Sequence, residues 1–270
     1  MNDDDIDGDE ERRRVPAELR GYLEELVRRV RAVCGARVVS VVAVGSVALG
    51  DYRHGRSDVD VVVVLEPDLP GSALTELARE LAHPRLPCPA AGLELVVYGA
   101  DVAASTSGGA GFLLNLNTGP LLAERADRDP TGAAAFWFVI DRSIAHRAGV
   151  TLWGAPARRA IAEPAPAGVF AALRAAVREH ADGAGHLADN RVLNGCRAVV
   201  FCRTGRWRAK RAAARETAAA EPGFRPLLEA ALRSFERPRS AADALPAAEV
   251  RAFLAWAGER VEEAAAAAGG

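Results

Sequence analysis

Residues 38–65 read VVSVVAVGSVALGDYRHGRSDVDVVVVL, and this stretch decides the fold class. A β-branched run leads into Gly45-Ser46, a polar loop follows, and a second β-branched run comes after Asp58. Valine-rich runs of this length, bounded by glycine and polar residues, are typical of buried strands. Because side chains on a strand repeat every two residues, Asp58 and Asp60 are expected on the same face.

The two acids stand in an otherwise apolar run, which is unfavourable unless they have a partner. Carboxylates this close repel each other, and burying both would cost free energy. Mg²⁺ that is bound together with nucleotide phosphates takes paired oxygen ligands of this kind. Gly45 and the small Ser46 let backbone N–H groups approach a phosphate closely. The stretch therefore predicts a phosphate–metal site and phosphoryl or nucleotidyl transfer, and the alternative is an exposed polar face of the strand.

A third acid, Glu94, is an isolated charge in the strand-like run Leu93–Tyr98. If this strand lies beside the Asp58/Asp60 strand, Glu94 points at the same site. A carboxylate there can accept the proton of an attacking hydroxyl or complete the shell of a metal ion. The alternative is a charge that protects an edge strand from aggregation. The three acids together favour the catalytic interpretation.

At this point the chain resembles the nucleotidyltransferase superfamily of polymerase-β type, which has Gly-Ser, Asp-x-Asp and a later lone acid in this order. A second region narrows the resemblance. It is similar to the segment that opens the helical C-terminal domain of the streptomycin/spectinomycin 3''-adenylyltransferases, and it carries Asn190, Leu193, Arg197, Thr204-Gly205 and Lys210. The resemblance covers about residues 38–229.

The resemblance implies a Mg²⁺-dependent enzyme that uses ATP, with its active site in a cleft between two domains. Asp58 and Asp60 would hold magnesium, and Glu94 would be the base, a further metal ligand, or both. The implied contacts with the triphosphate come from Gly45, Ser46, Ser57, Arg197 and Lys210, the last two from the helical domain. The acceptor would be a small molecule, a cationic aminoglycoside, and the acids nearest to the expected acceptor positions are Asp182 and Asp189.

Composition sets limits on the class of protein. With 270 residues, 50% of them hydrophobic and 26% charged, the chain is an ordinary globular protein of one large or two modest domains. A net charge of −2 argues against binding nucleic acid through a broad basic surface. No apolar run reaches membrane-spanning length, and the acidic N-terminus lacks the pattern of a secretory signal. The spacing of Cys34, Cys88, Cys196 and Cys202 predicts free thiols and a reducing cytoplasm. We expect a monomer or a weak dimer.

The order of the expected elements predicts an α/β nucleotidyltransferase domain with a mixed sheet and flanking helices, then an all-α domain. The predicted boundaries are an acidic disordered leader at 1–14, the α/β domain at 15–160 and the helical domain at 161–270. Strands are expected at 38–44, 59–65, 93–98 and 149–154. Helices are expected at 16–34, 72–81, 133–148, 169–184, 190–202, 209–219, 224–235 and 247–268. A flexible turn is expected at 105–111.

The sequence is compatible with three functions. The first is transfer of AMP from ATP to a hydroxyl of an aminoglycoside of streptomycin or spectinomycin type. The second is the same chemistry on another acceptor, such as a protein hydroxyl in a toxin–antitoxin module. The third is a catalytically silent nucleotide-binding regulator, against which the retention of three acids counts.

Overall fold

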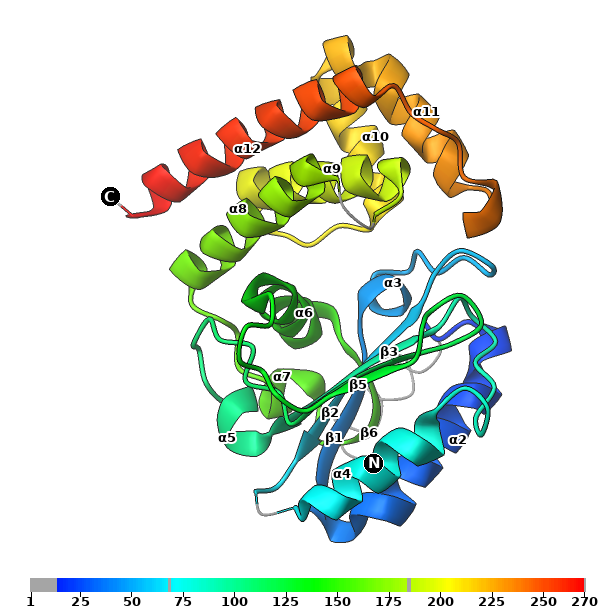
Figure 1. The fold of residues 1–270 in the computed structure, drawn as a ribbon. Coiled ribbons are helices and arrows are strands. Elements are labelled where there is room, and N and C mark those ends of the chain that lie inside the picture. Colours follow the sequence, from blue (N-terminus) through cyan, green and yellow to red (C-terminus); the bar gives the residue numbers. More distant parts are fainter. Residues whose placement is uncertain (1–13, 68, 184–185, 270) are drawn as a thin grey trace, which may run out of the picture. The chain divides into compact units, whose positions relative to one another are not determined.

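The computed structural model describes residues 14–269, apart from residues 68 and 184–185 (Figure 1). The acidic leader predicted at 1–14 therefore lies outside the described residues, except for Arg14. The chain divides into two compact units. The first contains the described residues up to Ala134 together with Asp141–Pro164, and the second contains Ala135–Ile140 and the chain from Ala165 onward.

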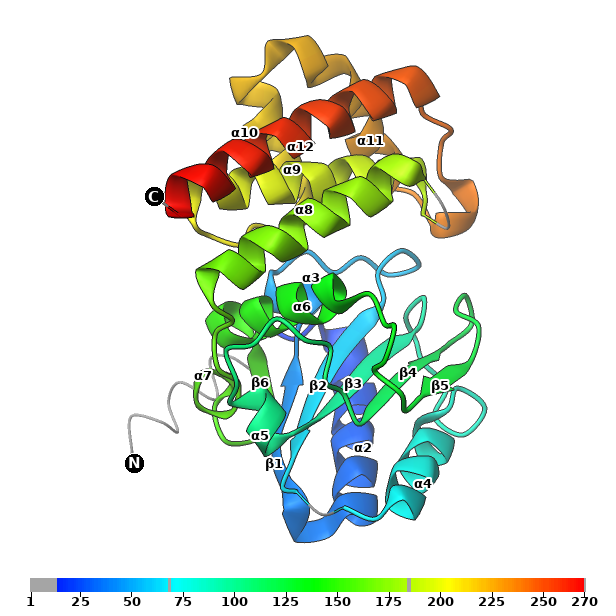
Figure 2. The ribbon, with the colours of Figure 1, turned by 60° about the vertical axis from the view of Figure 1, so that its left-hand side comes forward.

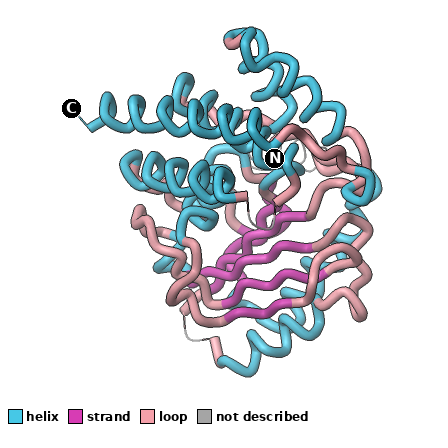
Figure 3. The backbone as a smooth tube through the Cα atoms, turned by 45° about the horizontal axis from the view of Figure 1, so that its top comes forward, coloured by secondary structure: helices cyan, strands magenta, loops and turns pink. Residues whose placement is uncertain are grey.

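The first unit is built on a six-stranded sheet with the strand order β5-β4-β3-β2-β1-β6. Figure 3 shows the strands of this sheet in magenta. Strands β2 and β3 pair in parallel, whereas the other neighbours pair antiparallel. This confirms the predicted mixed sheet. The strands are β1 (Val38–Ala43), β2 (Val59–Leu65), β3 (Leu93–Gly99), β4 (Leu114–Thr118), β5 (Arg125–Asp127) and β6 (Val150–Gly154).

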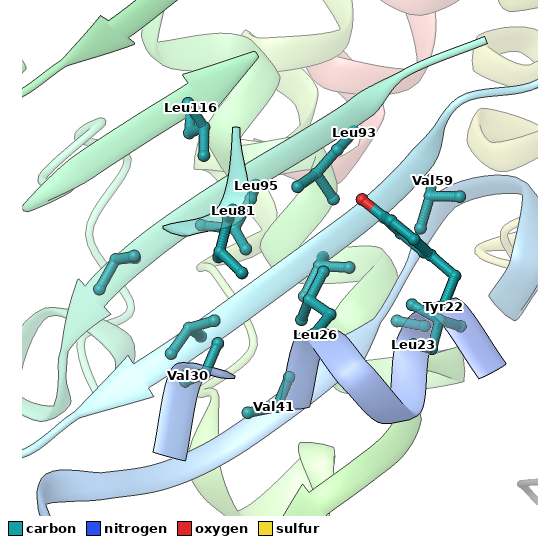
Figure 4. Packing of buried hydrophobic residues seen from close by; sticks show 14 of the residues in the cluster. Tyr22, Leu23, Leu26, Val30, Val41, Val59, Leu81, Leu93, Leu95 and Leu116 are labelled. Carbon is teal, nitrogen blue, oxygen red and sulfur yellow. The ribbon is translucent and has the colours of Figure 1, made fainter. Parts of the chain in front are cut away.

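One face of the sheet is covered by the helices α2 (Ala17–Cys34) and α4 (Gly71–Leu81). Leu19, Leu23, Leu26 and Val30 recur at helical spacing on α2 and are all buried against the strands. Figure 4 shows the α2 side chains pointing toward strand residues such as Val59 and Leu93. Full burial of each such side chain contributes roughly 1.5–3 kcal/mol, so this layer is the main stabilising core of the unit.

The opposite face of the sheet carries the polar positions of β2 and β3, and α5 (Ala100–Ala103) and α7 (Ala157–Ala160) lie on that side (Figure 1). The other short elements of this unit are η1 (Gly35–Arg37) and α3 (Gly45–Ala48). Helix α6 (Ala135–Ala148) begins in the second unit and ends in the first. Strands β4 and β5 and the helices α3, α5 and α7 were not predicted, because each is too short to show a period clearly.

The loop at 105–111, expected to be a flexible turn, is held by Arg142 of α6. This arginine has no exposed surface, and its guanidinium donates hydrogen bonds to four backbone oxygens. The acceptors belong to Val102 (3.2 Å), Ser105 (3.2 Å), Ser107 and Gly109 (3.3 Å). A guanidinium has five donors in a fixed fork, so one side chain can bind several carbonyl groups of a loop.

The second unit is helical, as expected, and its long helices are labelled in Figure 2. They are α8 (Pro166–Asp182), α9 (Ala188–Thr204), α10 (Lys210–Ala220), α11 (Arg225–Phe235) and α12 (Ala247–Gly269), with the short turns η2 (Pro222–Phe224) and η3 (Arg239–Ala241). Helix α9 is central, since it packs against each of the other four. Gly195 permits close packing there, because a Cβ atom would lie 3.0 Å from Phe253 and Leu254.

No helix among the described residues is long and apolar enough to cross a membrane.

Candidate active site

Asp60 of β2 and Glu94 of β3 are direct partners in the parallel pairing of the two strands. Their neighbours Val59, Val61, Leu93 and Leu95 are buried in the core beneath the sheet. Since side chains alternate along a strand, Asp60 and Glu94 lie together on the opposite face, where both are half-buried. The structure thus brings together two of the three predicted acids across adjacent strands.

Gly45 lies against the carboxylate of Asp60. A Cβ atom at Gly45 would be only 1.9 Å from Oδ2 of Asp60, so a side chain has no room at this position. Gly45 also has a φ of 56°, which favours glycine. The N–H of Val44 donates to the carbonyl oxygen of Asp60 over 2.9 Å. The end of β1 is therefore fixed to the residue that carries the second predicted acid.

Asp58 lies one residue before β2, between two residues that are anchored by backbone hydrogen bonds. Ala91 donates to the oxygen of Ser57 over 3.0 Å, and Val59 donates to the oxygen of Gly92 over 2.8 Å. The Ser57 hydroxyl accepts the N–H of Arg53 over 3.0 Å and closes the loop before it. These bonds extend the contact between the β2 and β3 segments back to Asp58.

Ser46 occupies the first turn of α3 with its hydroxyl oxygen buried. Within the part of the chain that the structure describes, this oxygen has no hydrogen-bond partner. A buried hydroxyl without a partner is costly, and a ligand oxygen beside it would remove that cost. The predicted phosphate contact of Ser46 is compatible with this arrangement.

The donor set at this face suits a divalent cation that prefers oxygen. Asp60 and Glu94 offer carboxylate oxygens on two adjacent strands, and Asp58 offers another just before β2; hard ligands of this type are the ones that Mg²⁺ takes. Among the described residues, no group of three or more histidine, cysteine, aspartate or glutamate side chains is already gathered closely enough to hold a metal ion. The chemistry of the donors fits magnesium, and Asp58 and Asp60 are the residues that would hold it.

The predicted ATP contacts of the second unit lie on α9 and at the start of α10. Lys210 donates from Nζ to the side-chain oxygen of Asn190 over 3.3 Å, and its ammonium group lies 5.8 Å from the ring centroid of Phe235. Asn190 and Arg197 are seven residues apart on α9, two helical turns along one face. The structure brings Asn190 and Lys210 together, although they are separated by a full helix in the sequence.

The two acids predicted to bind the acceptor have different surroundings. Asp182 is the exposed last residue of α8. Asp189 is fully buried near the start of α9. Its Oδ2 accepts a hydrogen bond from the Ser234 hydroxyl over 2.5 Å, and its Oδ1 accepts the N–H of Asn190 over 2.6 Å. Asp189 therefore holds the first turn of α9 to α11, and acceptor binding by Asp182 or Asp189 stays a prediction.

The second unit contains a cluster of aromatic rings that was not predicted from the sequence. His180 of α8 is buried, and its ring lies 4.9 Å from that of His186 and 5.5 Å from that of Trp137, centroid to centroid. Nδ2 of Asn194 lies 3.0 Å from Nε2 of His180. Burial, with smaller effects from the charges of His186, Lys210 and Arg191, lowers the pKa of His180 from 6.5 to about 3. The members come from α6, α8, α9 and the segment before α9, so no local pattern in the sequence predicts the cluster.

Residues 19–84 match a protein family described as nucleotidyltransferase domain, and this segment contains Gly45, Ser46, Asp58 and Asp60. The predicted nucleotidyltransferase domain is thereby confirmed, and the match supports an enzyme. Glu94 lies beyond the matched segment, so its assignment to the site rests on its pairing with Asp60.

One solved structure that the chain is similar to is a spectinomycin adenyltransferase, AAD(9) from Enterococcus faecialis, solved with ATP and spectinomycin. The TM-score is 0.63 at 16% sequence identity, and the match covers 88% of this chain and 98% of that one. At this identity the likeness establishes the fold, an α/β sheet domain followed by helices. A comparison with curated protein sequences found no match.

Proposed function

We propose that this protein catalyses the Mg²⁺-dependent transfer of AMP from ATP to a hydroxyl group of an aminoglycoside of streptomycin or spectinomycin type. The observation that supports it most is the pairing of Asp60 with Glu94, with Gly45 packed against the Asp60 carboxylate. The nucleotidyltransferase match over residues 19–84 supports the reaction class, and the fold shared with a spectinomycin adenyltransferase supports the acceptor class.

In the proposed reaction, the acceptor hydroxyl attacks the α-phosphorus of ATP. Glu94 accepts the hydroxyl proton while the new oxygen–phosphorus bond forms. The bond from the α-phosphorus to the bridging oxygen breaks, and pyrophosphate leaves with the electron pair. Asp58 and Asp60 would hold magnesium, which would supply positive charge to offset the negative charge of the reacting phosphate. Arg197 and Lys210 stabilise the triphosphate through charge-assisted hydrogen bonds.

Of the two predicted acceptor acids, the exposed Asp182 supplies negative charge that would attract a cationic aminoglycoside, whereas the buried Asp189 would act by holding the start of α9 in place. All four cysteines are free thiols, three of them buried, which fits activity in a reducing cytoplasm. If aminoglycosides are not modified, we expect the same AMP transfer to another acceptor, such as a protein hydroxyl.

The test is an assay of AMP transfer with purified protein, ATP and MgCl₂, using spectinomycin and streptomycin as acceptors. The mass of the acceptor should rise by one adenylyl group, with pyrophosphate released in equal amount, and EDTA should stop both. Glu94→Gln should lower kcat by roughly 10²–10⁴-fold, because it removes the general base. The matched control is Glu66→Gln, since Glu66 is an exposed glutamate directly after β2.

The proposal fails if neither compound gains mass while ATP–magnesium still binds. In that case, the same assay with candidate protein acceptors and intact-mass readout tests the second acceptor class. Wild-type rates in Glu94→Gln would show that this carboxylate is not the base.

A further inference from the structure

The row of side chains that contains Asp60 and Glu94 continues across the sheet. Glu94 of β3 pairs with Asn117 of β4, and Asn117 pairs in turn with Arg125 of β5. Directly paired residues present their side chains on the same face of a sheet. Four side chains from four strands therefore stand side by side in the order Asp60, Glu94, Asn117, Arg125.

The alternation along β4 fixes the orientation of Asn117. Leu114 and Leu116 are buried in the core with α2 and α4, so Asn115 and Asn117 face the other side, where both are half-buried. Within the described part of the chain, the side-chain amide of Asn117 makes no hydrogen bond. An amide donor and an amide acceptor thus stand unused beside the predicted base.

The order of the row assigns a direction of approach to the acceptor. Glu94 stands between Asp60 and Asn117, and Cβ atoms of directly opposite residues are about 4.5–5.5 Å apart. In the proposed function, Asp60 would hold the cation and its nucleotide, so the Asp60 side of Glu94 would be occupied. The attacking hydroxyl then reaches Glu94 from the side of Asn117.

We propose that Asn117 binds the acceptor and orients its reacting hydroxyl toward Glu94; this inference rests on the proposed function. The carboxamide can donate to one oxygen of the acceptor and accept from a second, and it carries no charge. It therefore suits a polyhydroxylated, uncharged part of the acceptor, with a hydroxyl next to the one that reacts. The cationic groups of an aminoglycoside lie elsewhere.

The neighbour on the far side of Asn117 agrees with this assignment. Arg125 places a guanidinium in the row next to Asn117, where it forms an ion pair with Asp127 of the same strand over 2.8 Å. Because Asp127 neutralises this guanidinium, the pair adds no net positive charge beside Asn117, and its N–H groups can donate to oxygen atoms of an acceptor. Hydroxyl groups of an acceptor can accept hydrogen bonds from both Asn117 and Arg125. This edge of the sheet therefore suits a hydroxylated part of the acceptor.

The experiment compares Asn117→Ala with Asn115→Ala in the spectinomycin adenylylation assay. Asn115 is the matched control. It lies on the same face of β4, two residues before Asn117, and it pairs with Val96 and not with Glu94. Loss of one or two hydrogen bonds should raise the KM for spectinomycin by roughly 5–20-fold in Asn117→Ala. The KM for ATP should change less than about twofold, and the melting temperatures of both variants should match.

Asn117→Asp provides a second variant of the same shape. It replaces the amide donor by a carboxylate next to Glu94, so the KM for spectinomycin should rise at least as much as in Asn117→Ala. Asn117→Gln, which keeps the amide on a longer stem, should lose less than either.

The outcomes distinguish the role of Asn117 from the proposed function as a whole. If the wild-type protein transfers AMP and Asn117→Ala keeps the spectinomycin KM of Asn115→Ala, the role of Asn117 is overturned while the proposed function stands. Equal rises in the KM values for ATP and spectinomycin would also overturn it, since they indicate a general disturbance of the site. If the wild-type protein modifies neither aminoglycoside, both the proposed function and this inference fall.

Discussion

A methyl group at Gly45 would lie 1.9 Å from Oδ2 of Asp60, well inside the contact distance of any two non-bonded atoms. The backbone after β1 and the carboxylate on β2 therefore occupy adjoining space that only a glycine leaves open. The backbone bond from Val44 to Asp60 keeps them there. The segment after β1 and strand β2 therefore meet at Asp60, the predicted metal ligand.

Gly45→Ala should abolish AMP transfer, because the new methyl group must displace the Asp60 carboxylate. Gly50→Ala is the control. Gly50 also has a positive φ, of 67°, but a Cβ atom there meets nothing within 4 Å. Both variants should lose about 1–2 kcal/mol of stability from backbone strain, measured by urea unfolding, and only Gly45→Ala should lose activity. Equal activity in the two would show that the position of Asp60 does not matter for transfer.

Asp58→Asn and Asp60→Asn should each remove AMP transfer and leave the melting temperature unchanged or slightly higher. Removing one charge relieves the repulsion between neighbouring carboxylates, and the amide keeps the shape.

ATP with Mg²⁺ should raise the melting temperature of the wild-type protein and of Glu66→Gln, since a ligand that binds the folded state stabilises it. The two aspartate variants should show a much smaller rise. A large drop in melting temperature without ligand would instead identify the acids as structural.

The stability of the protein should fall as the pH drops from 6.5 toward 3, in part because of His180. Its pKa in the folded protein is lowered from 6.5 to about 3, so below pH 6.5 the unfolded chain takes up a proton that the folded chain does not. One such group contributes a slope of at most about 1.4 kcal/mol per pH unit in this window.

Urea titrations of the wild-type protein and His180→Gln at pH 7, 6 and 5 measure this slope. The variant should be less stable at pH 7 but should lose less stability on acidification. His54→Gln, at an exposed loop position, is the control and should follow the wild-type protein. Parallel curves for the wild-type protein and His180→Gln would contradict the prediction.

Arg142→Lys should destabilise the protein by about 2–4 kcal/mol, because an ammonium group cannot bind four carbonyl oxygens in the fork geometry of a guanidinium. The control is Arg85→Lys, an exposed residue paired with Glu80 over 3.0 Å, which should change the stability by less than about 1 kcal/mol. Urea unfolding measures both. Proteolysis in the loop at 105–111 should become faster in Arg142→Lys alone.

Much of the fold was predictable because its elements carry long local patterns. The run after Asp58 and the helix Ala17–Cys34 show their periods over whole elements, and both appear in the structure within a residue of the predicted bounds. Strands β4 and β5 were missed, although the alternation of leucine and asparagine at 114–117 is a period-two signal. With five and three residues, they are too short to stand out from a loop without a paired neighbour.

The sequence by itself determined which residue types were available for the chemistry: an Asp-x-Asp at the start of a valine-rich strand, a glycine before it and one acid in a later strand. Each of those features is local in the sequence. Alternation along one strand relates Asp58 to Asp60, but it does not relate either of them to Glu94. Only the tertiary structure decided that Asp60 pairs with Glu94 and Glu94 with Asn117, and that His180 and Trp137 approach each other. Strand register and helix packing join segments distant along the chain, and they depend on how whole faces bury their apolar surface.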